Sequence, residues 1–148
     1  MNRKSCFFIG HREATDEIYP SLQAAVEQHI AEFGVTEFIV GRYGGFDNPA
    51  ARAVMQAKKT HPEVTLTLLL PYHPAERLLN VSKGFDGTYY PFGMENVPRR
   101  VAIVRANRYM VDHVGYLIAY VWHPGSNARK LVEYAEKQFG MNICMLDK

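Results

Sequence analysis

The chain has 148 residues, of which 47% are hydrophobic, and this length suits one domain with a two- or three-layer core. Its 17 basic and 15 acidic residues give a formal net charge of +2, which excludes a uniformly basic nucleic-acid surface and confines any basic site to a local patch. No early stretch has the pattern of a secretory signal, and no apolar run approaches the ~20 residues of a membrane helix. The sequence therefore predicts a soluble, cytoplasmic protein with no membrane partner.

The cysteines and potential metal ligands point to neither a disulfide nor a metal site. Cys6 and Cys144 both lie inside apolar runs, without a CxxC spacing or a second pair. No His, Cys and carboxylate residues have the spacing of metal ligands. We expect two reduced core thiols, no metal and no cofactor.

The first half of the chain alternates strand and helix patterns. A strand at Lys4–Ile9 is followed by a helix from Pro20 to Phe33, which Gly34 ends. A second strand spans Glu37–Val40, and Asn48 and Pro49 then suit the N-cap and first position of a helix. The apolar run Val64–Leu70 is typical of a strand covered on both faces, and Pro71 and Pro74 close it and begin a short helix.

The second half continues the alternation. A strand is expected at Asp86–Tyr90, and Val97–Val114 has the apolar spacing of a helix, with Asn107 and Arg108 falling on its apolar stripes. Buried polar groups need partners, because a lone one costs about 1–3 kcal/mol. The last unit is a strand at Tyr116–Val121, a helix with its apolar stripe at Ala128, Leu131, Val132, Ala135 and Phe139, and a strand at Asn142–Leu146.

This alternation predicts one α/β domain over residues 1–148. Right-handed crossovers lead to a Rossmann-like, doubly wound sheet of five to six mostly parallel strands, with helices on both faces and the first strand in the centre. The carboxyl ends of parallel strands gather along one edge, which is the usual ligand crevice of such folds.

Three apolar runs end in glycine-bearing loops that precede helices, and these loops indicate a site at that edge. They are Gly10-His11-Arg12, Gly41 to Asp47, and His123 to Asn127. Glycine lets backbone amides approach a ligand, and helix N-termini favour anions. Five arginines are expected on or near this edge and reinforce the preference for an anion, namely Arg12, Arg42, Arg105, Arg108 and Arg129.

Taken together, four motifs resemble those of the SLOG superfamily over nearly the whole chain. They are Gly10-His11-Arg12, Gly44-Gly45-Phe46-Asp47, Ala106 to Asp112, and Gly125-Ser126-Asn127-Ala128. Within the superfamily the chain is most similar to the YpsA-like branch. Other members include the LOG phosphoribohydrolases, which release a base from a nucleoside monophosphate, and DNA-processing proteins of the DprA type, whose helix carries a similar Arg-Asn-Arg segment. The resemblance implies a nucleotide-like ligand without fixing a reaction.

The chain departs from the LOG pattern at the residues that perform catalysis. LOG hydrolases carry Pro-Gly-Gly-x-Gly-Thr-x-x-Glu, in which the glutamate is catalytic. In this register Asn127 stands where the threonine is expected and Lys130 where the glutamate is expected. A lysine cannot supply a carboxylate's charge, whereas serine, asparagine and a helix N-terminus can still bind an anion. The departure favours binding over catalysis.

Each candidate residue also has a purely structural interpretation. Gly44 and Gly45 either form a tight turn or admit a ligand, and Asp47 either caps a helix or binds ribose hydroxyls or acts as a base. Arg108 either pairs with Asp112, one turn on, or binds an anion. His123, Tyr43, Tyr89, Tyr90 and Trp122 are weaker candidates for ligand contact. The predicted ligand-binding residues are Gly10, His11, Arg12, Gly44, Gly45, Asp47, Asn107, Arg108, Gly125, Ser126 and Asn127, and the candidate catalytic residues are Asp47 and Asp112.

Three functions remain open from the sequence. The first is a module that binds or senses a nucleotide or nucleotide-derived small molecule. The second is a hydrolase acting on the N-glycosidic or phosphate bond of such a ligand, with Asp47 or Asp112 replacing the missing glutamate. The third is a single-stranded DNA binder, which the near-neutral charge disfavours, so nucleic acid is not the expected partner. A homodimer or higher oligomer is compatible with all three.

Overall fold

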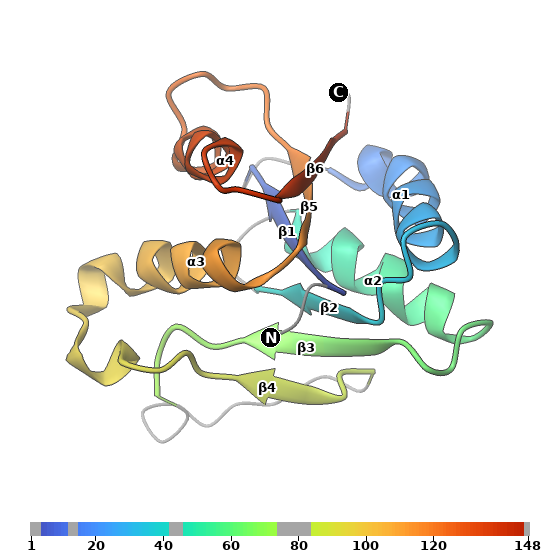
Figure 1. Cartoon of the computed structure of the whole chain (residues 1–148), viewed down its shortest axis with the longest axis horizontal. Helices are drawn as coiled ribbons and strands as arrows, with labels where there is room; N and C mark the ends of the chain where they lie inside the picture. The colour runs from blue at the N-terminus through green and yellow to red at the C-terminus, as the bar shows by residue number, and fades with distance from the viewer. Residues whose placement is uncertain (1–3, 12–14, 42–45, 74–83, 147–148) are drawn as a thin grey trace.

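A computed structural model of the chain describes residues 4–11, 15–41, 46–73 and 84–146. Within these ranges, six parallel strands form one sheet in the order β4-β3-β2-β1-β5-β6 (Figure 1). The strands are β1 (Ser5–Gly10), β2 (Glu37–Val40), β3 (Thr65–Leu69), β4 (Gly87–Tyr89), β5 (Tyr116–Tyr120) and β6 (Asn142–Met145). The α-helices are α1 (Tyr19–Ala31), α2 (Asp47–Lys58), α3 (Ala102–His113) and α4 (Asn127–Glu136). The predicted Rossmann-like fold is confirmed.

The sheet is buried on both faces, so its strands carry apolar residues at successive positions. In β1, Cys6 and Phe8 belong to the core under α1 and α2, whereas Phe7 and Ile9 belong to the core under α3 and α4. Side chains alternate between the faces of a strand, so a continuous apolar run serves both cores. The result is the three-layer arrangement of Figure 1.

Successive strands are added on one side of β1 and later on the other side. The chain builds β2, β3 and β4 on one side of β1, and then returns to place β5 and β6 on the other. The register pairs Gly10, the last residue of β1, with Tyr120, the last residue of β5. The loops that follow these two strands therefore diverge from adjacent points, and such a switch point is where ligands bind in open α/β sheets.

Several predicted elements have the expected bounds. The second strand is Glu37–Val40, as predicted, and Gly34 follows α1 with a φ of 72°, the left-handed conformation of a helix stop. The strand predicted at Asp86–Tyr90 is present as β4 but is one residue shorter at each end. Both cysteines are free thiols, with Cys6 buried and Cys144 half-buried. The short helix predicted after Pro71 and Pro74 falls on residues 74–83, outside the described ranges.

Two predicted helix starts are wrong. The second helix begins at Asp47, not after an Asn48 cap, because the completely buried Phe46 anchors its first turn. The segment predicted as one helix from Val97 contains a 3₁₀ turn at Arg99–Val101 and becomes α-helical only at Ala102. Pro98 explains the delay, since the residue before a proline is pushed toward extended backbone and Val97 has a ψ of 129°.

The apolar stripes of α3 and α4 are also narrower than predicted. The buried residues of α3 are Ala102, Ala106, Met110 and Val111, whereas Val104 is 46% exposed and Arg108 is exposed. The last helix ends at Glu136, and Phe139 beyond it is fully exposed rather than in the stripe. Gly140, with a φ of 79°, helps turn the chain into β6 at this point.

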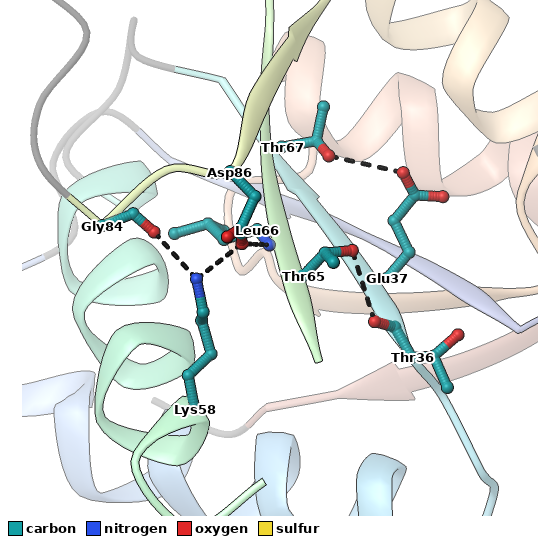
Figure 2. A network of polar contacts seen from close by, with 8 residues as sticks. All are labelled: Thr36, Glu37, Lys58, Thr65, Leu66, Thr67, Gly84 and Asp86. Atoms are coloured by element: carbon teal, nitrogen blue, oxygen red, sulfur yellow. Dashed lines mark hydrogen bonds and ion pairs between the residues drawn. The ribbon is translucent and has the colours of Figure 1, made fainter. Parts of the chain in front are cut away.

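The edge strand β4 is held in place by a lysine from α2 (Figure 2). Lys58 Nζ donates to Gly84 O at 3.2 Å and to Asp86 Oδ2 at 2.5 Å, and the same carboxylate oxygen accepts from the Leu66 amide at 2.8 Å. The hydrogen bond from Lys58, followed by the one from Leu66, lowers the pKa of Asp86 below its usual value. These contacts fix the chain that enters β4 against β3 and α2.

A buried histidine makes the stability of this fold dependent on pH. His29 in α1 is 1% exposed, and its Nδ1 lies 2.7 Å from Ala25 O. Burial is the main cause of the lowered pKa of His29, whose ordinary value is 6.5. As the pH falls below 6.5, the unfolded chain binds a proton that the folded chain does not, so the free energy of unfolding decreases.

We therefore expect the free energy of unfolding to be smaller at about pH 5 than at about pH 7.5, and His29→Leu to reduce this difference. Urea denaturation at the two pH values measures it. The exposed residue His113 offers a control, because His113→Asn leaves His29 buried. An unchanged pH dependence in His29→Leu would contradict the assignment.

Candidate functional site

A cavity of about 350 Å³ lies at the carboxyl edge of the sheet, at the switch point between β1 and β5. It is bounded by the ends of β1 and β2, the first turn of α2, one side of α3 and the start of α4. The lining residues are Phe7, Phe8, Ile9, Gly10, His11, Gly41, Asp47, Ile103, Val104, Asn107, Arg108, Ser126, Asn127, Ala128, Lys130 and Leu131. Seven of the residues predicted from the sequence are brought together here: Gly10, His11, Asp47, Asn107, Arg108, Ser126 and Asn127.

Gly10 is required by packing. A Cβ built on Gly10 would lie 2.2 Å from Phe46 Cγ, far inside van der Waals contact. Phe46 is completely buried and its ring packs against Phe8 and Tyr120 at centroid distances of 6.3 and 6.0 Å. The start of α2 thus presses against the end of β1, and the absence of a side chain at Gly10 makes this approach possible.

His11 joins the two loops that leave the switch point. Its Nε2 accepts hydrogen bonds from the backbone amides of Trp122, at 2.7 Å, and His123, at 3.0 Å. A ring nitrogen that accepts cannot carry a proton, so neutral His11 holds its proton on Nδ1. The side chain is 3% exposed and packs edge-on against the Trp122 ring, with centroids 4.2 Å apart. His11 therefore lines the cavity and also fixes the loop after β5.

Asp47 brings a carboxylate to the cavity from the first turn of α2. A Cβ built on Gly41 would lie 3.2 Å from Asp47 Oδ2, so the glycine leaves room for this carboxylate beside the end of β2. The N-cap of α2 is Phe46, and Asp47 is the first residue of the helix. Binding of ribose hydroxyls by Asp47, or its action as a base, remains a prediction.

The start of α4 presents backbone amides to the cavity. Ser126 is the N-cap, and its Oγ accepts from the Arg129 amide at 3.0 Å and donates to His123 O at 3.0 Å. The hydroxyl is therefore engaged in holding the loop and the helix together. Asn127 and Ala128 follow in the first turn and line the cavity, where helix N–H groups lack carbonyl partners within the helix. This end of the helix also carries the positive end of its dipole.

The opposite wall of the cavity comes from α3. Ile103 and Asn107 are half-buried and one turn apart, and Val104 and Arg108 repeat this spacing on a more exposed stripe. The Arg108 guanidinium carbon lies 4.7 Å from the centroid of the Tyr134 ring in α4. The aliphatic side chains of Ile103, Val104 and Leu131 form an apolar surface. The polar side chains of Asn107 and Arg108 lie beside it.

Lys130 is the lining residue whose role the sequence reasoning missed. The sequence marks it only as a lysine where an acid is expected, but it lies one turn after Ser126 and Asn127 and lines the same cavity. The helical spacing of three to four residues was the available signal. Among the described lining residues, Lys130 and Arg108 supply two cationic side chains, and Asp47 supplies the single carboxylate.

Asp112, a candidate catalytic residue, does not share this cavity. It lies near the end of α3, where its Oδ1 accepts from Tyr134 Oη at 2.6 Å, and it lines a smaller hollow with Gly115 and Gly140. The cause is helical geometry, because α3 carries Asp112 away from the carboxyl edge. The alternative pairing of Arg108 with Asp112 is not among the ion pairs of the described residues, and the Asp112 carboxylate accepts from Tyr134 instead.

Other predicted residues do not belong to the lining of the cavity. Gly125 and Arg105 are outside it, and Arg129 Nε is 3.8 Å from Glu133 Oε2. Tyr89 is engaged with Tyr109 through a 3.2 Å hydroxyl contact, and Trp122 packs on His11. Several predictions fall outside the described ranges, namely Arg12, Arg42, Tyr43, Gly44 and Gly45.

Within the described ranges, no group of three His, Cys or acidic residues has the arrangement of a metal site. No helix in the same ranges is long and apolar enough to cross a membrane. Comparison with known proteins adds no family to this description, because no protein-family model and no curated protein sequence matches the chain.

Substitution by alanine is expected to lower the stability of the protein at Gly10 but not at Gly125. Gly10→Ala forces a methyl group into Phe46 and should lower the free energy of unfolding by about 1–3 kcal/mol. Gly125→Ala is the matched control, since a Cβ there would meet nothing within 4 Å. Urea denaturation of both variants measures the difference. Equal effects of the two substitutions would show that the close approach of Phe46 to Gly10 does not determine the loss of stability.

Proposed function

We propose that the chain binds a nucleotide or a nucleotide-derived small molecule at the carboxyl edge of the sheet and serves as a binding or sensing module. The observation that carries the proposal is the composition of the cavity at the switch point. Its volume of about 350 Å³ is at the lower end of the ~300–1,000 Å³ usual for small-molecule sites.

The cationic side of the cavity suits a phosphate. Lys130 and Arg108 line it beside the first turn of α4, whose amides can donate to phosphate oxygens. Ile103, Val104 and Leu131 provide an apolar wall against which a base can pack. Asp47, on the side formed by α2, provides acceptors for sugar hydroxyls. Each part of a nucleotide thus has a chemically matched wall.

The resemblance of four motifs to the SLOG superfamily supports the same ligand class. All four motifs contribute to the cavity lining, through Gly10, Asp47, Asn107 and Ser126. On this basis we propose that the chain is a SLOG-like domain that has kept the ligand-binding edge of the fold.

Hydrolysis of the ligand is the second candidate function, and Asp47 is the observation that favours it. Its carboxylate is at the cavity and is the only acid among the lining residues that the structure describes. A carboxylate can act as a general base toward an attacking water. Lys130, however, places a cation where related hydrolases carry their catalytic acid, so binding without turnover is the function that we favour.

The proposal predicts selective binding of nucleotides. We expect the 5′-monophosphates of adenosine, guanosine, cytidine or uridine to bind more tightly than the same nucleosides in titration calorimetry. Lys130→Ala should weaken binding of the monophosphate by about 1–2 kcal/mol, or roughly five- to thirtyfold, with little change for the nucleoside. Lys137→Ala, which alters a lysine beyond the end of α4, is the control.

The same samples decide between binding and turnover. An unchanged nucleotide after incubation supports the binding module, whereas release of free base or phosphate supports the hydrolase. In the second case Asp47→Asn should abolish release while binding persists. If none of the four monophosphates binds, or if Lys130→Ala binds them as the unmodified protein does, the proposed site is wrong.

A further inference from the structure

Arg108, Tyr134 and Asp112 form a contact chain between α3 and α4 beside the cavity. The Arg108 guanidinium carbon lies 4.7 Å from the Tyr134 ring centroid, and Tyr134 Oη donates to Asp112 Oδ1 at 2.6 Å. Arg108 lines the cavity, whereas Tyr134 and Asp112 do not. Tyr134 of α4 is therefore bonded through its hydroxyl to the Asp112 carboxylate of α3. The face of its ring lies against the Arg108 guanidinium, one turn earlier on α3.

We propose that Tyr134, tethered by Asp112, is a positioning residue that holds the Arg108 guanidinium at the cavity for the anionic group of the ligand. This inference rests on the proposed function, and it names the part of the site that recognises the phosphate. It also gives Asp112 a role that does not require it to touch the ligand.

The need for support follows from the position of Arg108. Its side chain is exposed, and a free arginine loses rotamer entropy when one conformation is selected. A ring packed under the guanidinium limits these conformations before a ligand arrives, and a cation over a tyrosine face is itself attractive. Preorganisation of this kind raises affinity by reducing the ordering cost that binding must meet.

The tether keeps the ring in place. The hydrogen bond from Tyr134 to Asp112 is the main cause of the raised pKa of Tyr134, so the phenol remains a protonated donor throughout the neutral range. Asp112 lies one helical turn after Arg108 on α3, so the bond also joins the two helices that form the walls of the cavity. The ring is thus held at both its hydroxyl and its face.

Two other arginines of the described residues also stack on tyrosine rings. Arg52 lies 4.6 Å from the Tyr19 ring centroid and Arg99 lies 4.4 Å from that of Tyr72. Neither of these pairs lines the cavity. Among the three stacked arginines, only Arg108 belongs to the lining of the proposed binding site.

Two substitutions of Tyr134 test the proposal. Tyr134→Leu removes the ring and Tyr134→Phe keeps the ring but removes the bond to Asp112. Asp112 itself is left unchanged, because neutralising it would also alter the electrostatic field acting on a bound anion. Tyr109→Phe is the matched control, since it removes a hydroxyl from a neighbouring tyrosine of α3 whose contact is with Tyr89.

The first measurement compares adenosine, guanosine, cytidine and uridine with their 5′-monophosphates by calorimetry. Tyr134→Leu should weaken the monophosphates about three- to tenfold, Tyr134→Phe by less, and Tyr109→Phe not at all. The nucleosides should change by less than about twofold, because they carry no anion for Arg108 to bind. Equal losses for nucleosides and nucleotides would indicate general damage to the site and overturn the positioning role.

The second measurement needs no ligand. In the NMR spectrum of the unmodified protein, the Arg108 side-chain protons should be shifted upfield by the Tyr134 ring current, and Tyr134→Leu should return them to ordinary positions. Unshifted protons in the unmodified protein would overturn the inference. If the unmodified protein binds no monophosphate, the proposed function fails and the inference with it. If it binds them and Tyr134→Leu binds equally well, the inference alone fails.

Discussion

The hydrogen bonds that His11 accepts from the Trp122 and His123 amides join two loops that the topology would otherwise send apart. After β1 the chain leaves toward α1, and after β5 it leaves toward α4. One unprotonated ring nitrogen binds both amides, at 2.7 and 3.0 Å, and each amide left without a partner would cost about 1–3 kcal/mol. Because His123 O in turn accepts from Ser126, this junction determines where α4 begins.

The position of α4 then decides which side chains reach the cavity. Starting the helix at Asn127 turns Lys130 and Leu131 toward α3 one turn later, and it brings Tyr134 opposite Arg108 after a further turn. On the other side of the sheet, Phe46 packs against Gly10 and sets the start of α2, which carries Asp47. Two local contacts at the end of β1 thus position both the cationic and the acidic walls of the site.

Much of this architecture was predictable from the sequence, since it depends on periodicity and on glycine and proline. Apolar runs such as residues 38–40 of β2 and helix stops such as Gly34 act locally, and the parallel sheet follows from the alternation of strand and helix patterns. The roles of Gly10 and His11 were not predictable, because they depend on Phe46 and Trp122, which are distant in sequence. The same holds for Asp112: the helical spacing offered Arg108 as one possible partner, but the carboxylate accepts from Tyr134, which lies on another helix. Contacts between residues that are far apart in the sequence leave no pattern in the residues around either partner.

The charge of Lys130 bears on what the proposed ligand can undergo. Cleavage of an N-glycosidic bond builds positive charge on the sugar, and catalysis requires stronger stabilisation of that state than of the bound substrate. A cation has the reverse preference: it attracts the phosphate and repels the developing charge, with unit charges 4 Å apart interacting by about 1–4 kcal/mol at solvated sites. The residue that would strengthen nucleotide binding therefore opposes its cleavage. Among the described lining residues, the acid that could act in catalysis is Asp47 on the wall formed by α2, whereas the walls formed by α3 and α4 are suited to holding the proposed nucleotide intact.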